Sequence, residues 1–226
     1  MHLPRRLLAE ALGTAFLLAV VVGSGIMGQR LAGGNVAIAL LANAVATGAG
    51  LFALILTFAP ASGAHFNPVV SMAMCLRGGL SARDAAAYAG AQLVGAIAGV
   101  AAAHCMFDLP LFSISQHDRI GVAQAWSEFV ATYGLILVII GSSRFAAEST
   151  PAAVAAYITA AYWFTASTSF ANPAVAIARS LTDTFAGIAP GGVPAFIGAE
   201  MAAAIAAVLS ARVLFPIHAS ETVAAH

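Results

Sequence analysis

The sequence predicts an all-α membrane protein with six transmembrane helices and two half-helices arranged as inverted repeats. Three observations predict this fold: an apolar composition, long apolar segments separated by polar breaks, and a short motif that occurs in both halves. Of the 226 residues, 61% are hydrophobic and only 8% are charged. Soluble domains carry about 25% charged residues, so this chain lacks the polar surface of a water-soluble globule. Lipid is the solvent that suits such a composition.

The charge and cysteine content argue against several classes of function. The net charge is zero, all nine basic residues are arginine, and no basic run indicates a nucleic-acid partner. Cys75 and Cys105 lie in apolar context without the spacing of a metal site, which predicts small buried side chains. We therefore expect no metal and no cofactor.

Apolar stretches of about 20 residues mark the spanning helices. The basic start, residues 1–6, precedes an apolar run and is also typical of a signal peptide. That run is long enough to span and contains Glu10, so we expect it to be the first transmembrane helix. The six predicted spans are approximately 6–28, 35–59, 83–106, 123–143, 152–168 and 194–215.

Polar or helix-breaking residues separate the six spans. Ser81 with Asp84 three residues later predicts a helix cap before the third span. Pro151 is well placed at the start of the fifth span. The other breaks are residues 33–35, 108–121 and 190–192.

Two further apolar pieces, residues 67–76 and 172–182, are too short to span a bilayer. Each would form roughly 15 Å of helix, so two of them end to end would cover about one hydrocarbon thickness. Both begin with Asn-Pro, and asparagine as cap followed by proline favours a helix start.

Arginine placement predicts the orientation of the chain. An even number of spans puts both termini on one side, where most arginines would gather. These are Arg5, Arg6, Arg77, Arg83, Arg144 and Arg212. The positive-inside bias therefore predicts that both termini are cytoplasmic.

The two halves of the chain match each other in order. We expect one channel domain over residues 1–226, with repeat one at about 1–106 and repeat two at about 122–216. An odd number of spans in each half forces opposite orientations, and interrupted segments at equivalent positions indicate a pore at the midplane. The matched pairs are Glu10 with Glu128, residues 67–70 with 172–175, and Gln92 with Glu200.

The N-terminal ends of the two half-helices would form the functional site of the pore. Backbone bonds would hold the side-chain oxygens of Asn67 and Asn172, so that their amide NH2 groups point into a lumen. Aligned peptide dipoles add roughly half a positive charge at each tip. Neutral hydrogen-bond acceptors would pass, whereas cations and protons would meet a barrier.

The irregular stretches before each half-helix would line the pore with backbone, because such backbone is tolerated at membrane depth only when packed in protein or facing water. We expect pore-lining backbone at Gly63, Ala64, His65 and Thr168. The side chain of His65 has three interpretations: a lumen wall, a structural hydrogen-bond donor, or a pH gate.

Glu10 and Glu128 are carboxylates within predicted spans, where ionisable groups are functional by default. We favour structural support of the adjacent loops over a proton relay, because the two are symmetry mates near helix ends.

The motifs at residues 62–68 and 170–174 make the chain resemble the major intrinsic protein family, the aquaporins and aquaglyceroporins. The resemblance covers about residues 5–215. It identifies Asn67, Pro68, Val69, Asn172, Pro173 and Ala174 as the paired pore motif. It also implies a homotetramer with one pore in each protomer.

Family spacing places the outer selectivity filter at Thr47, Ala160, Ser169 and Val175. All four are small and uncharged, and Val175 stands where the family usually has arginine. The resemblance therefore implies a wide mouth. Arg179 lies one turn further along, where a salt bridge with Asp183 is expected and a reach back toward the filter is the alternative.

The second half also resembles a bacterial subgroup of aquaglyceroporins often linked to arsenic resistance. It implies a channel in the inner membrane that passes arsenite-type metalloids, glycerol or water, all small and uncharged. The alternatives are a general water or glycerol channel and, from other classes, a secondary transporter or an intramembrane enzyme. No pairing of nucleophile and base supports an enzyme.

Overall fold

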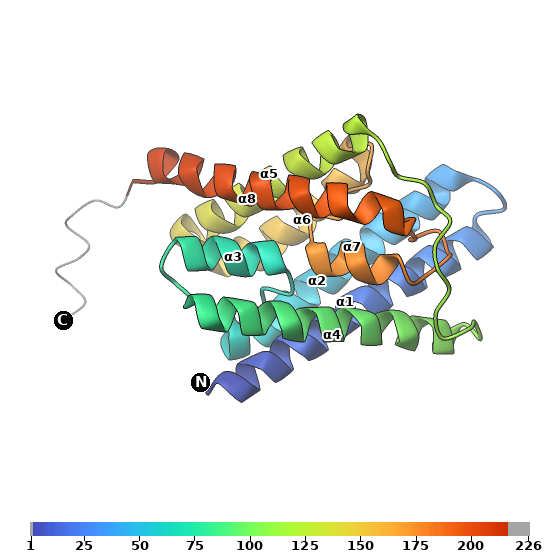
Figure 1. Ribbon diagram of the computed structural model, residues 1–226, viewed down its shortest axis with the longest axis horizontal. Coiled ribbons are helices and arrows are strands. Elements are labelled where there is room, and N and C mark those ends of the chain that lie inside the picture. The colour runs from blue at the N-terminus through green and yellow to red at the C-terminus, as the bar shows by residue number, and fades with distance from the viewer. Residues whose placement is uncertain (1, 217–226) are drawn as a thin grey trace.

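The computed structural model describes residues 2–216 and consists of helices joined by short connections (Figure 1). No β-strand occurs in this range. The last part of the predicted domain, residues 217–226, lies outside the described residues. The helices are α1 (Leu3–Leu31), α2 (Val36–Ser62), α3 (Pro68–Leu76), α4 (Ala82–Met106), α5 (Val122–Phe145), α6 (Thr150–Phe164), α7 (Pro173–Arg179) and α8 (Val193–Leu214), with short 3-10 turns at Ala147–Ser149 and Pro190–Gly192.

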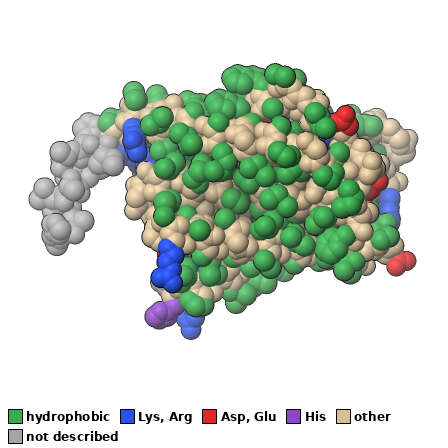
Figure 2. Space-filling model, in the orientation of Figure 1, with side chains coloured by type: hydrophobic (Ala, Val, Ile, Leu, Met, Phe, Trp, Pro, Cys, Tyr) green, Lys and Arg blue, Asp and Glu red, His purple; other side chains and the backbone are tan. Residues whose placement is uncertain are grey.

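Five of these helices are long and apolar enough to cross a membrane: α1, α2, α4, α5 and α8 with the turn before it. Figure 2 shows hydrophobic side chains over the middle of the visible face, with charged side chains at its two ends. This distribution matches a bilayer core bounded by two polar interfaces. The chain is a multi-pass membrane protein.

Two helices are shorter than the sequence predicted. α6 has 15 residues, roughly 22 Å, and ends at Phe164 instead of residue 168. Thr165 is extended, and its hydroxyl donates to the carbonyl of Ala161 at 2.7 Å. The chain must turn inward there to bring Asn172 to the centre. α7 ends at Arg179 after seven residues, so its dipole is weaker than the predicted ten-residue piece would give.

The element order helix, helix, half-helix, helix occurs twice, as predicted. α1 packs on α2 and α4, while α5 packs on α6 and α8. α3 and α7 each contact both α4 and α8, so the half-helices lie between the two halves. In Figure 1, α1 and α5 run in opposite directions, and the start of α1 and the end of α8 lie at the same end of the molecule.

Glycines on α4 allow the backbones of α1 and α4 to touch. A Cβ atom at Gly95 would lie 2.1 Å from the carbonyl oxygen of Ala11, and one at Gly99 would lie 2.2 Å from that of Ala15. No side chain fits at either distance. Close crossing at small residues is the usual basis of helix association in lipid.

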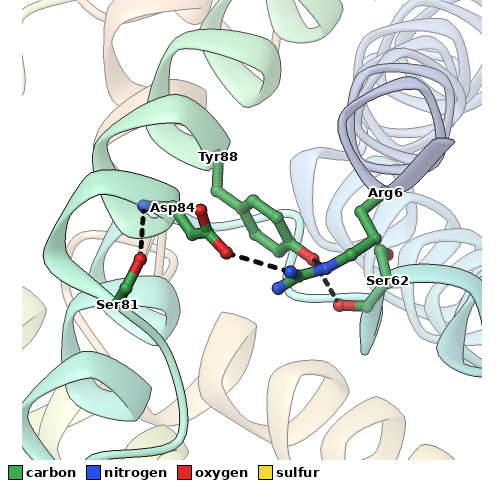
Figure 3. Close-up of polar contacts among 5 residues, drawn as sticks. All are labelled: Arg6, Ser62, Ser81, Asp84 and Tyr88. Carbon is green, nitrogen blue, oxygen red and sulfur yellow. Dashed lines mark hydrogen bonds and ion pairs between the residues drawn. The ribbon is translucent and has the colours of Figure 1, made fainter. Parts of the chain in front are cut away.

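A polar network ties the start of α1 to α4 and to the end of α2 (Figure 3). Arg6 donates to the Tyr88 hydroxyl at 2.7 Å and forms an ion pair with Asp84 at 3.0 Å. Tyr88 in turn donates to the Ser62 carbonyl at 2.8 Å. The Ser81 hydroxyl accepts from the Asp84 N–H, which confirms the predicted cap.

The cysteine prediction is only partly right. Cys75 is half-buried, but Cys105 is exposed next to the end of α4. Both are free thiols.

Candidate functional site

The two half-helices meet tip to tip through their cap asparagines. The side-chain oxygen of Asn67 accepts from the Val69 N–H at 3.0 Å, and its Nδ2 donates to the Ala171 carbonyl at 2.7 Å. The Nδ2 of Asn172 donates in the other direction, to the Phe66 carbonyl at 2.8 Å. Each amide therefore holds the loop that precedes the opposite half-helix.

This geometry refines the predicted role of the asparagines. The oxygen of Asn172 accepts from the N–H groups of Ala174 and Val175, so both caps form as expected. The NH2 groups, however, do not point freely into a lumen, because one N–H of each spans the contact between the halves. An amide NH2 has two donors, so one N–H of each asparagine is left for a solute.

The loops before the two asparagines have the same unusual backbone. In each loop, the residues four, three and one positions before the asparagine have positive φ. Five of these six residues are not glycine, and each left-handed residue of that kind costs roughly 1–2 kcal/mol. Such strain persists only where surrounding bonds fix it. The residues are Gly63, Ala64 and Phe66, matched by Thr168, Ser169 and Ala171.

Glu10 provides the bonds that hold the strained loop in the first half. Its carboxylate is fully buried and accepts from the N–H groups of His65 at 3.0 Å and Phe66 at 2.7 Å. It also accepts from the Ser62 hydroxyl at 2.6 Å and the Gln92 amide at 2.8 Å. With both oxygens occupied, Glu10 acts as a loop anchor, which is the role that the sequence favoured.

Glu128 anchors the second loop with fewer bonds. Its oxygens accept from the N–H groups of Phe170 at 2.9 Å and Ala171 at 2.6 Å. Glu200, the counterpart of Gln92, accepts from the Asn172 N–H at 2.9 Å and interacts electrostatically with Glu128. Its Oε2 is buried without a partner among the described residues.

A cavity of about 230 Å³ runs past both asparagines. Its wall is largely apolar, with few polar groups, and it is built from matching positions of the two halves. The matched lining pairs are Leu17 with Leu135, Val21 with Ile139, Val70 with Val175, and Met74 with Arg179. We call the end with His65 and Met74 the α3 mouth, and the end with Phe170 and Arg179 the α7 mouth.

Most of the predicted lining residues face this cavity. Gly63, Ala64 and His65 line it, and the His65 ring is within 3.0 Å of the Ser71 hydroxyl. Thr168 does not line it. Its hydroxyl accepts from Arg119 at 3.3 Å, because the loop turns Ser169 inward instead.

The other motif residues pack behind the asparagines. Val69 and Ala174 are buried in the apolar core, and none of these residues is part of the cavity wall. They are Pro68, Val69, Pro173 and Ala174.

Three of the four predicted filter residues line the cavity: Thr47, Ser169 and Val175. Ala160 does not, and it is exposed on the outside of α6. Ile158 and Tyr162 line the wall in its place. Positions two residues apart on a helix differ by about 200°, so family spacing selected the wrong face of α6. A spacing of four residues along α6 would have indicated the face that lines the cavity, since it connects Thr150, Val154, Ile158 and Tyr162.

Tyr162 also changes the predicted character of the filter. Its hydroxyl lies 3.2 Å from the Thr47 hydroxyl, and the side chain is 3% exposed. The hydroxyl of Ser169 is buried and without a partner in residues 2–216, at the cavity wall. The ring is therefore not uniformly small, since it contains one bulky phenol and several hydroxyl groups.

Arg179 lies at the α7 mouth and is 2% exposed. Its Nε donates to the Ala186 carbonyl, and its guanidinium carbon is 3.4 Å from the centre of the Phe170 ring. The predicted salt bridge with Asp183 is absent among the described residues. The Asp183 carboxylate accepts from the Gln116 N–H instead.

Arg119, from the loop between α4 and α5, lies near the same ring at 5.4 Å. It donates to the carbonyls of Ser167, Phe185 and Gly187 and so braces the loop before α7. Burial lowers the pKa of its guanidinium. This role could not be predicted from the sequence, because Arg119 is distant from both motifs along the chain.

Comparison with known proteins gives consistent similarities. The family model described as Major intrinsic protein matches residues 1–158. The chain is 56% identical to "Aquaglyceroporin AqpS" of Rhizobium meliloti (strain 1021), over 93% of this chain and 90% of that protein. It is 34% identical to "Aquaporin-2" of Rattus norvegicus over 62% of this chain and 51% of that protein.

A solved structure has the same fold. The X-ray structure of the aquaglyceroporin from Plasmodium falciparum superposes with a TM-score of 0.76, covering 95% of this chain and 98% of that one, at 20% identity.

Proposed function

We propose, from the premise that this chain belongs to the major intrinsic protein family, that it passes uncharged polyhydroxyl solutes such as glycerol and arsenite. The family and the AqpS relative make the chain an aquaglyceroporin channel for small solutes and not an enzyme. The identity of the solutes is the proposed part.

The cavity at Val175 carries the proposal. A valine lines the wall at the position where the family usually places the filter arginine. Without that guanidinium the passage keeps more room and fewer fixed donors. Arsenite near neutral pH is As(OH)3, an uncharged molecule whose hydroxyl groups resemble those of glycerol. Hydroxyl groups of Thr47 and Tyr162, with the asparagine amides, would exchange hydrogen bonds with it.

A general water or glycerol channel is the second candidate, and Tyr162 favours it. Its phenol stands in the ring where a small residue was predicted. A bulky side chain narrows a pore and discriminates against the larger solutes first.

The cellular setting belongs to the same proposal. We place the chain in the inner membrane of a bacterium with both termini in the cytoplasm, so that the α7 mouth faces outward. We also propose a homotetramer with one passage in each protomer. Each protomer would present its apolar outer face to lipid and to the other protomers. No nucleic-acid partner is proposed.

Flux into liposomes containing the purified protein tests the proposal. Light scattering follows water and glycerol, and arsenic analysis of the trapped volume follows arsenite. We expect glycerol and arsenite to enter far faster than in protein-free liposomes. Rapid water flux with arsenite at the protein-free rate would support the second candidate instead.

A further inference from the structure

We infer that Arg179 is a specificity-determining residue at the α7 mouth, where it binds the oxygen atoms of permeating solutes and repels cations. The inference deepens the proposed channel function and rests on it. Arg179 stands four residues beyond Val175, so it is a different position from the filter arginine that the chain lacks.

The helix geometry brings Arg179 to the passage. Residues four apart on a helix share a face, and Val175 and Arg179 both line the cavity. The first half repeats this arrangement with Val70 and Met74. Met74 and Arg179 are each seven residues after a cap asparagine. The same lining position is therefore a thioether at one mouth and a guanidinium at the other.

The guanidinium of Arg179 has unused donors. Its Nε is bonded to the Ala186 carbonyl, while Nη1 and Nη2 make no hydrogen bond with residues 2–216. Arginine carries five N–H donors, so four remain. Buried donors of a charged group are normally satisfied, and at a cavity wall the available partners are a solute's oxygen atoms.

The Glu128 carboxylate acts on this charge electrostatically but forms no ion pair with Arg179. In the described part of the chain Arg179 has no ion pair, and nearby Arg119 bonds only to carbonyls and the Thr168 hydroxyl. Both guanidinium groups lie against the Phe170 ring, and such stacking holds a cation without cancelling its charge. In a poorly screened site this positive charge favours oxygen-rich neutral or anionic solutes and opposes cations.

The test compares Arg179→Met with the wild-type protein in liposomes. This change gives the α7 mouth the side chain that the α3 mouth already has. Proton entry is followed with a trapped pH-sensitive dye under a potassium gradient with valinomycin, and glycerol entry by light scattering. We expect the proton leak to rise about tenfold or more, because a unit charge near the path is lost, while glycerol flux is maintained or increased.

Three further variants make the result specific. Arg179→Lys keeps the charge and should leak close to the wild-type rate. Arg179→Gln removes the charge but retains a donor for the Ala186 carbonyl, so it replaces the methionine variant should that one not assemble. Arg30→Met is the matched control, since Arg30 is exposed at the end of α1 and contacts the Phe107 carbonyl.

An unchanged proton leak in a neutral variant that still conducts glycerol would overturn the inference, as would an equal leak in the Arg30 control. A wild-type protein that passes no glycerol would refute the proposed function instead. In that case the assembly of the neutral variants is checked by size-exclusion chromatography in detergent, and an unchanged proton leak in an assembled neutral variant overturns the inference about Arg179.

Discussion

The two half-helices share one scaffold but differ in the groups that they present at their mouths. Both have an asparagine cap, a left-handed approach loop and a glutamate anchor, and each holds the loop of the other. At the α3 mouth the lining positions are His65 and Met74, whereas at the α7 mouth they are Phe170 and Arg179. The repeated backbone thus builds the cavity in the same way from both halves, whereas the side chains at its two ends differ.

The anchors differ between the halves as well. Glu10 accepts four hydrogen bonds, one of them from Gln92. Glu128 accepts two, both from backbone N–H groups, and stands beside a second carboxyl group, Glu200. Two neighbouring buried carboxyl groups repel each other when both are ionised. The first loop is therefore the more firmly anchored.

Loss of an anchoring glutamate should destabilise the protein more than any other change considered. Glu10→Ala leaves the buried N–H groups of His65 and Phe66 unpaired, at about 1–3 kcal/mol each. We expect a large fall in the thermal unfolding temperature of the purified protein, measured by circular dichroism in detergent. Glu128→Ala should lower it less, and a larger fall for Glu128→Ala would contradict the comparison of the two anchors.

A blocked passage should follow from Thr47→Trp. An indole at this lining position fills the space beside Tyr162, and we expect glycerol flux in liposomes to fall about tenfold or more. Ala160→Trp is the control on the outside of α6 and should stay within about twofold of the wild type. If Ala160→Trp reduced the glycerol flux as strongly, the result would support the prediction from family spacing that Ala160 belongs to the filter.

Val175→Arg restores a guanidinium at the usual filter position, one turn from Arg179. We expect the narrower and more positive ring to reduce glycerol and arsenite flux several-fold and water flux less, because the largest solutes lose most. Light scattering measures water and glycerol, and arsenic analysis measures arsenite. Equal loss of all three solutes in a correctly assembled protein would count against the size argument.

The smallest effect is a gain of stability. Glu200→Gln copies the arrangement of the first half: its amide can donate to Glu128 while its oxygen still accepts from the Asn172 N–H. We expect stabilisation of about 1 kcal/mol, seen as a higher unfolding temperature. The reciprocal change, Gln92→Glu, should destabilise the first half beside Glu10. A lower unfolding temperature for Glu200→Gln would show that Glu200 has another role.

The sequence predicted the order of the elements, the paired half-helices and the anchoring glutamates, because these depend on hydrophobic length and on repeated local motifs. It misplaced Ala160, because the lining face of α6 depends on where the helix ends and not on distance from the motif. It also assigned Arg179 to a salt bridge with Asp183. That interaction is lost because α7 stops at Arg179, so the two residues do not share a helix.

We propose that solutes cross through the cavity between the two asparagine tips without coupling to another gradient. The most direct test is the initial rate of glycerol entry into liposomes over a wide range of glycerol gradients, with and without a protonophore. We predict a rate proportional to the gradient and unchanged by the protonophore. A rate that saturates, or that depends on a proton or sodium gradient, would contradict the claim and indicate a transporter.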